Sequence, residues 1–213
     1  MIKISPSILS ADFSKLGYDV DRVEKGGAEY LHIDVMDGMF VPNMSFAFPI
    51  ISSLRKVTDI FLDVHLMIEK PERYIDRFID SGADLITFHL EATDDVDACI
   101  EMIKKRGVKV SISVKPNTPI EAVYPYLDRC DMILVMTVEP GYGGQALIPF
   151  CLDKVKALRE EITKRGLNVD IQVDGGINNK TAADAIKAGA NVLVAGSAVF
   201  NYEDRTAAID ALR

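Results

Sequence analysis

Apolar residues gather in short runs along the whole chain, and many of these runs are rich in valine and isoleucine. Runs that are apolar at nearly every position are typical of strands buried on both faces of a parallel sheet. The pattern predicts eight strands, at residues 2–7, 30–35, 60–66, 85–88, 108–114, 132–136, 169–173 and 192–195.

Between these runs, apolar residues recur at helical spacing. Clear cases are Leu16, Val20 and Val23, then Tyr74, Phe78 and Ile79, then Leu152, Val155, Leu158 and Ile162. Dividing 213 residues by eight leaves about 27 per unit, which suits one strand, one helix and two short loops. Gly-Ala pairs at Gly27, Gly82 and Gly189 each precede a strand, as expected where a helix ends in a tight turn. We therefore predict an α/β fold, a (β/α)₈ TIM barrel forming a single domain over residues 1–213, in preference to an open doubly wound sheet.

Composition narrows the classes of partner. The formal net charge is -8 and Lys and Arg are nowhere concentrated, which argues against a nucleic-acid surface. No apolar run approaches the roughly 20 residues that span a bilayer. Three cysteines without a CxxC spacing indicate neither a disulfide framework nor a zinc ribbon. We expect a soluble cytoplasmic protein with no nucleic-acid and no membrane partner.

Histidine and aspartate occur together at the period of a strand. His32 and Asp34 share the second run, Asp63 and His65 share the third, and Asp174 follows the seventh. Residues two apart on a strand point to the same face, and functional side chains of a barrel gather at the carboxyl ends of its strands. Imidazoles with carboxylates are a preferred ligand set for Zn²⁺ or Fe²⁺. We predict a metal site of His32, Asp34, His65 and Asp174, with Asp63 supporting the third strand.

Other strand ends are predicted to border this site. Ser7 ends the first strand, and Met36, Met67 and Met136 occupy similar positions on later strands. The methionines are either core filler or a polarizable apolar lining around a reacting carbon. We interpret His89, after the fourth strand, as a structural or substrate-side loop residue and not as a ligand.

Glycine-rich turns follow the sixth, seventh and eighth predicted strands. Glycine lets backbone N–H groups approach an oxyanion closely, and the last two loops of a barrel often hold a phosphate. An acidic protein could bind a phosphorylated substrate in this way. The turns contain Gly141, Tyr142, Gly143 and Gly144, then Gly175 and Gly176, then Gly196 and Ser197.

Seven segments between residues 5 and 200 form motifs, and several are long enough to be highly specific. They are SPSILSADF (5–13), HIDVMDG (32–38), FVPN (40–43), DVHLM (63–67), VMTVEPGYGGQ (135–145), VDGGI (173–177) and AGSA (195–198). Together these motifs resemble the ribulose-phosphate 3-epimerase family.

The resemblance implies a barrel enzyme of carbohydrate metabolism, an isomerase of the pentose phosphate pathway. Such an enzyme interconverts D-ribulose 5-phosphate and D-xylulose 5-phosphate with one divalent metal ion, Zn²⁺ or Fe²⁺, with Mn²⁺ or Co²⁺ also possible. It implies that the four predicted ligands bind the metal, and that Asp34 and Asp174 exchange protons with carbon 3 through a metal-stabilised enediolate. Ser7 and His65 would contact the sugar, and the glycine turns would surround its phosphate. We also expect a homo-oligomer.

Two departures from the family pattern leave the choice of sugar open. Many members have histidine at the position of Met39 and glycine at that of Ala47, both in the loop after the second strand. D-allulose 6-phosphate 3-epimerase is therefore an alternative. A decarboxylase or aldolase is disfavoured because related decarboxylases carry Asp-x-Lys-x-x-Asp where this chain has DVHLM. A non-catalytic sugar-phosphate-binding barrel is disfavoured because Asp34 and Asp174 are both present.

Overall fold

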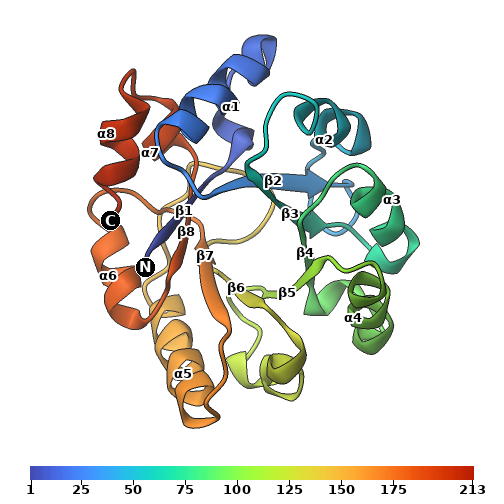
Figure 1. The fold of residues 1–213 in the computed structure, drawn as a ribbon. Helices are drawn as coiled ribbons and strands as arrows, with labels where there is room; N and C mark the ends of the chain where they lie inside the picture. The colour runs from blue at the N-terminus through green and yellow to red at the C-terminus, as the bar shows by residue number, and fades with distance from the viewer.

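The computed structural model describes residues 1–213, and its eight parallel strands form one sheet curled into a barrel (Figure 1). Neighbours follow the order β1-β8-β7-β6-β5-β4-β3-β2, and a bridge between Ser7 and His32 brings β1 against β2. The predicted barrel is confirmed. The strands are β1 (Lys3–Pro6), β2 (Tyr30–Met36), β3 (Phe61–Met67), β4 (Leu85–His89), β5 (Lys109–Val114), β6 (Met132–Met136), β7 (Asp170–Asp174) and β8 (Val192–Ala195).

Helices surround the ring of strands. The α-helices are α1 (Leu16–Lys25), α2 (Phe48–Leu54), α3 (Ile75–Asp80), α4 (Val96–Lys105), α5 (Cys151–Lys164), α6 (Ala182–Ala188), α7 (Ser197–Phe200) and α8 (Arg205–Asp210). Between β5 and β6 the connection is a 3₁₀ segment, Ile120–Arg129, with Pro125 inside it. Proline lacks the N–H that a regular α-helix needs, which accounts for the irregular turn. Shorter 3₁₀ turns lie at Ile8–Ser10, Phe13–Lys15, Pro71–Arg73 and Leu90–Ala92. None of the helices is long and apolar enough to cross a membrane.

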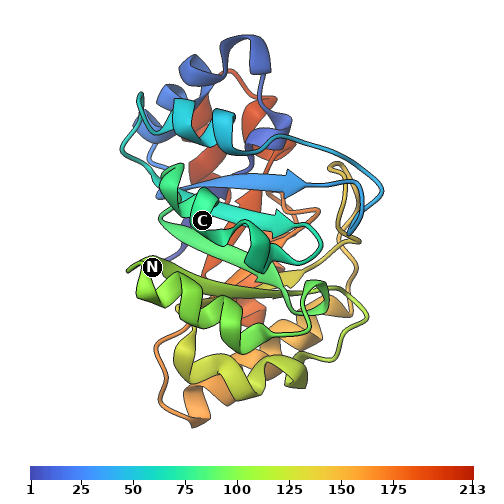
Figure 2. The ribbon, with the colours of Figure 1, turned by 90° about the vertical axis from the view of Figure 1, so that its right-hand side faces the viewer.

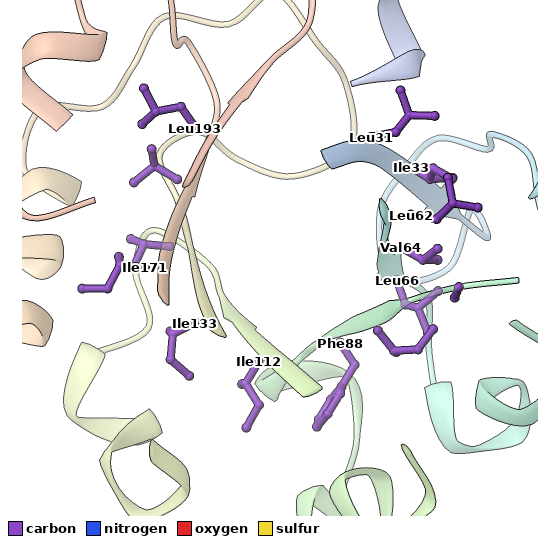
Figure 3. Packing of buried hydrophobic residues seen from close by; sticks show 14 of the residues in the cluster. Leu31, Ile33, Leu62, Val64, Leu66, Phe88, Ile112, Ile133, Ile171 and Leu193 are labelled. Carbon is purple, nitrogen blue, oxygen red and sulfur yellow. The ribbon is translucent and has the colours of Figure 1, made fainter. Parts of the chain in front are cut away.

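The main hydrophobic core lies between the sheet and the helices. Alternate strand residues such as Leu31 and Ile33 on β2, or Leu62, Val64 and Leu66 on β3, point outward and join a cluster of 47 buried residues (Figure 3). Successive strand residues point to opposite faces, so the residues between them point into the barrel. The outward face therefore provides most of the apolar burial, and the inward face is left free to carry polar groups.

Inside the barrel, the amino-terminal end is closed by apolar side chains. Tyr30, Leu85, Met132 and Val192, from the even-numbered strands, form a separate buried cluster against which Phe61 packs. Towards the carboxyl ends of the strands the interior becomes polar. All strands point to one end of the molecule, where the loops after β2 and β6 extend beyond the arrowheads (Figure 2).

Candidate active site and metal centre

Four side chains from β2, β3 and β7 converge inside the barrel. His32 Nε2 lies 3.3 Å from both His65 Nδ1 and Asp34 Oδ1, and His65 Nδ1 lies 3.2 Å from Asp34 Oδ1. Asp174 Oδ2 is 3.7 Å from His32 Nε2 and 3.8 Å from His65 Nδ1. One ligand atom of each residue lies within 4.8 Å of all the others. The structure thus brings together the four residues that the sequence pattern selects as metal ligands.

The donor set fits a divalent cation in both spacing and chemistry. With metal–ligand bonds of about 2.0–2.1 Å, a tetrahedral set places its donors about 3.3 Å apart. Five of the six separations among the two imidazole nitrogens and two carboxylate oxygens of the cluster are 3.2–3.8 Å, and none exceeds 4.8 Å. Unprotonated, all four atoms are electron-pair donors that face one another. Such an arrangement is stable only around a positive charge, either a bound cation or a proton.

Asp63 orients His32 from below the cluster. Its fully buried carboxylate accepts hydrogen bonds from His32 Nδ1 at 2.8 Å, from Gln172 Nε2 at 2.5 Å and from Ser5 Oγ at 3.1 Å. A carboxylate only accepts, so neutral His32 carries its proton on Nδ1 and turns the Nε2 lone pair toward the cluster. The sequence predicts only that Asp63 supports β3. In the structure its carboxylate supports His32, a candidate ligand on the neighbouring strand β2.

His89 belongs to the site more closely than the sequence interpretation allows. It is the last residue of β4 and not a loop residue, and its ring is fully buried. Its Nε2 lies 2.9 Å from His65 Nε2, and its Nδ1 lies 3.3 Å from the carboxylate of Glu91. Burial lowers the pKa of His89 to about 4, so the ring is neutral near pH 7. The carboxylate at i+2 is the sequence signal that could have found this pair.

Burial and mutual charge set the proton affinities of the cluster. Burial lowers the pKa of His32, but the charges of Asp63 and Asp34 outweigh it and raise that pKa well above its ordinary value. Burial raises the pKa of Asp34, but His32 and His65 oppose it more strongly and the net shift is downward. Burial and then the charge of Asp34 raise the pKa of Asp174 to about 6. The two carboxyl groups therefore differ in proton affinity, as an acid and a base must.

An open pocket lies above the cluster at the carboxyl end of the barrel. Asp34 and Asp174 reach its surface, and Ser7 Oγ donates a 2.6 Å hydrogen bond to Asp34 Oδ2. Of the residues predicted to lie beside the substrate, all except His65 line the pocket. They are Ser7, Met36, Met67, Met136, Gly141, Tyr142, Gly143, Gly144, Gly175, Gly176, Gly196 and Ser197. His65 is fully buried and does not line it, so direct contact of His65 with a substrate stays a prediction.

Sequence reasoning missed part of this lining and placed two other residues too close to it. Ser10, Glu139 and Asn178 line the pocket, and only their positions in the loops after β1, β6 and β7 could have indicated them. Met39 is 71% exposed, and neither Met39 nor Ala47 lines the pocket. The lining also contains no Lys or Arg, so an anion in this pocket would depend on backbone N–H groups.

The glycines around the pocket serve two different physical needs. A Cβ atom at Gly175 would collide with Val138, and one at Gly176 would collide with the backbone of Leu147, while both residues have positive φ. By contrast, Gly143 and Gly144 have open space where a Cβ atom would lie. The turn after β7 therefore needs glycine for close packing, whereas the turn after β6 leaves its backbone open to the pocket.

Comparison with known proteins identifies the family. The model of the ribulose-phosphate 3-epimerase family matches residues 3–200. Ribulose-phosphate 3-epimerase from Bacillus subtilis (strain 168) is 49% identical over 214 residues, covering 100% of this chain and 99% of the relative.

This chain belongs to the ribulose-phosphate 3-epimerase family. A second relative, ribulose-phosphate 3-epimerase from Schizosaccharomyces pombe, is 44% identical and covers 99% of this chain and 92% of its own length. The family resemblance drawn from the seven motifs is thereby confirmed, and the chain is an epimerase, an enzyme of the isomerase class.

Solved structures with low sequence identity support the fold of this ribulose-phosphate 3-epimerase family member. A crystal structure of 3-hexulose-6-phosphate synthase is 18% identical, with a TM-score of 0.70 over 100% of this chain and 98% of that chain. The 3-keto-L-gulonate-6-phosphate decarboxylase from Vibrio cholerae is 17% identical, with a TM-score of 0.73 over 100% and 95%. At this level of identity the likeness concerns the barrel and not the reaction.

Proposed function

We propose that this enzyme interconverts D-ribulose 5-phosphate and D-xylulose 5-phosphate by moving protons at carbon 3 with two aspartates, in a site that holds one divalent cation. Full-length similarity to ribulose-phosphate 3-epimerases supports the substrate. The observation that carries the mechanism is the pair Asp34 and Asp174, which come from two strands that are not neighbours and share one pocket above two histidines.

His32, His65, Asp34 and Asp174 would hold the cation, which we propose to be Zn²⁺ or Fe²⁺ because imidazole and carboxylate suit both. When bound, it would supply positive charge beside the substrate oxygens, where negative charge develops as the proton leaves carbon 3. The protein's own contribution is to hold the two carboxylates rigidly. Ser7 does this for Asp34, and the buried histidines surround both.

Inversion at carbon 3 removes a proton from one face of the sugar and returns another proton to the opposite face. One aspartate must therefore begin as carboxylate and the other as carboxylic acid. We assign the carboxylate to Asp34, because without a cation its histidine neighbours outweigh burial and lower its pKa, and the acid to Asp174, whose pKa burial and the charge of Asp34 raise to about 6. The roles exchange in the reverse reaction.

The rest of the pocket would bind and shield the sugar. Backbone N–H groups of the turns after β7 and β8, around Gly176 and Ser197, would receive the phosphate, since no basic side chain lines the pocket. Met36, Met67 and Met136 form an apolar wall that would exclude water from the reacting carbon.

The decisive experiment is solvent exchange. The enzyme is incubated in D₂O with D-ribulose 5-phosphate, and in parallel with D-allulose 6-phosphate, and deuterium at carbon 3 is followed by NMR. We expect label and epimer with ribulose 5-phosphate, loss of both after chelation, and recovery when Zn²⁺ or Fe²⁺ is added back. Faster labelling of allulose 6-phosphate would overturn the assignment of ribulose 5-phosphate as the preferred substrate. Turnover that survives complete metal removal would overturn the proposal that the reaction needs a divalent cation.

A further inference from the structure

A chain of contacts leads from the ligand cluster through β4 to the protein surface. His65 Nε2 lies 2.9 Å from His89 Nε2, and His89 Nδ1 lies 3.3 Å from Glu91 Oε2. The rings of His65 and His89 stack at 29° with centroids 5.0 Å apart. These contacts lie on the side of His65 that faces away from the other ligands, whose atoms surround Nδ1.

Hydrogen-bond chemistry permits one proton arrangement along this chain when His65 binds a cation through Nδ1. The only proton of neutral His65 is then on Nε2, so His65 must donate and His89 Nε2 must accept. His89 accepts at Nε2 only if its own proton is on Nδ1, which faces the Glu91 carboxylate, an acceptor. Every donor on this path therefore meets an acceptor. If the proton of His65 were on Nδ1, an N–H group would point into the ligand cluster. The lone pairs on Nε2 of His65 and Nε2 of His89 would then face each other.

The surroundings of His89 hold this arrangement in place. The ring of Phe40 covers His89 with centroids 4.8 Å apart, and the Lys115 ammonium lies 3.9 Å above the Phe40 ring. Glu91 is fixed in turn, because its other oxygen accepts a 2.8 Å hydrogen bond from the Lys115 backbone N–H and a hydrogen bond from the Thr118 hydroxyl. Neither His89 nor Glu91 lines the pocket, so both are placed to act through His65.

We propose that His89, backed by Glu91, is a positioning residue that fixes the tautomer and ring orientation of His65 and so sets the affinity of the cluster for its cation. This inference rests on the proposed function, since it requires that the cluster binds a divalent cation. Partners that accept the remote N–H of a ligating histidine raise the basicity of that ligand, and losing such a partner typically weakens metal binding about 10–100-fold.

The test compares variants at β4 by their zinc dissociation constants, measured by competition with a chromophoric chelator. His89→Leu removes the acceptor, and we expect about 10–100-fold weaker zinc binding. His89→Gln restores an oxygen acceptor near the position of Nε2 and should recover most of the affinity. Thr87→Val is the matched control, because Thr87 is an equally buried residue of β4 whose hydroxyl makes no hydrogen bond. This control should bind zinc like the parent protein.

NMR of the zinc-loaded parent protein reads the tautomer directly and does not depend on any variant folding. The ¹⁵N shifts of His65 should show zinc at Nδ1 and a proton at Nε2, with the His89 proton on Nδ1. A proton on His65 Nδ1, or a folded His89→Leu variant with parental zinc affinity, would overturn the inference. If the parent protein itself fails to bind divalent cations, the proposed function fails instead, so the two failures are distinguishable.

Discussion

Asp63→Asn tests how far the ligand cluster depends on a residue that never reaches the pocket. The substitution keeps the shape of the side chain but removes its charge. The carboxylate of Asp63 is fully buried and accepts from three donors, His32, Gln172 and Ser5. All three donors meet one oxygen, Oδ2, while Oδ1 has no hydrogen-bond partner, so an amide oxygen can take the place of Oδ2 and the amide nitrogen that of Oδ1. The three hydrogen bonds then go to an uncharged oxygen and are therefore weaker.

Two consequences can be given magnitudes. In the cation-loaded protein, His32 Nδ1 faces an uncharged acceptor that holds its tautomer less firmly, so zinc affinity should fall about 10–100-fold, or about 1.4–2.7 kcal/mol. In the protein stripped of metal, His32 and Asp63 form a buried pair with a 2.8 Å contact. Removing one partner of a buried pair costs about 3–5 kcal/mol. The free energy of unfolding should therefore fall by about 3 kcal/mol, since the amide keeps part of the hydrogen bonding.

Both quantities are measurable on the same samples, zinc affinity by chelator competition and stability by urea unfolding after chelation. Asp170→Asn is the matched control, because Asp170 lies on β7 at the opposite end of the barrel, where it pairs with Lys3 at 2.5 Å. This variant should lose stability without losing zinc affinity. Parental zinc affinity in a folded Asp63→Asn protein would refute the positioning role of Asp63.

Three further predictions concern the pocket and the stability of the protein at low pH. Asp34→Asn and Asp174→Asn should each lower epimerisation at carbon 3 at least about 100-fold, as expected for loss of acid–base catalysis, and near-parental turnover of either would contradict the two-aspartate scheme. Ser197→Ala removes the hydroxyl and keeps the backbone N–H; it should raise KM about 2–10-fold at unchanged kcat if the hydroxyl also binds the phosphate, and an unchanged KM argues against that role of the hydroxyl. The pKa of Glu91 is lowered to about 2, because hydrogen bonds from His89, Thr118 and the Lys115 backbone outweigh burial. The stabilisation that the charge of Glu91 contributes is fully present above about pH 4.5 and is lost as the pH falls toward 2. Glu91→Gln should remove about 2 kcal/mol of this pH-dependent stability, a value reduced for the partial exposure of the side chain. An acid-unfolding curve identical to that of the parent protein would count against this prediction.

The architecture and the ligand set follow from local pattern. Eight apolar runs separated by helical spacing favour a helix-covered parallel sheet, because helices on the outside bury the second face of each strand. His32 with Asp34, and His65 on the next strand, share the inward face by strand period alone. The positions of the glycine turns after late strands likewise placed the pocket at the carboxyl end of the barrel.

Contacts across the barrel could not be predicted in the same way. Asp63 meets Gln172 across 109 positions of sequence, and His89 meets His65 across 24. Which inward side chains touch depends on the tilt and register of the strands when the sheet closes, and that register arises from the packing of the whole barrel. The role of a glycine is equally hard to predict from sequence. Gly175 and Gly143 both lie in glycine-rich turns, but only at Gly175 would a Cβ atom collide with a neighbouring side chain.

The amino-acid sequence by itself thus determined the barrel, through eight apolar runs that alternate with helical spacing, and the four residues of the candidate metal centre, through the two-residue period of a strand and their places at strand ends. Tertiary structure alone decided which nitrogen of each histidine faces the centre. That choice is made by Asp63, His89 and Glu91, and they reach the histidines only because closing the barrel brings their strands and loops together.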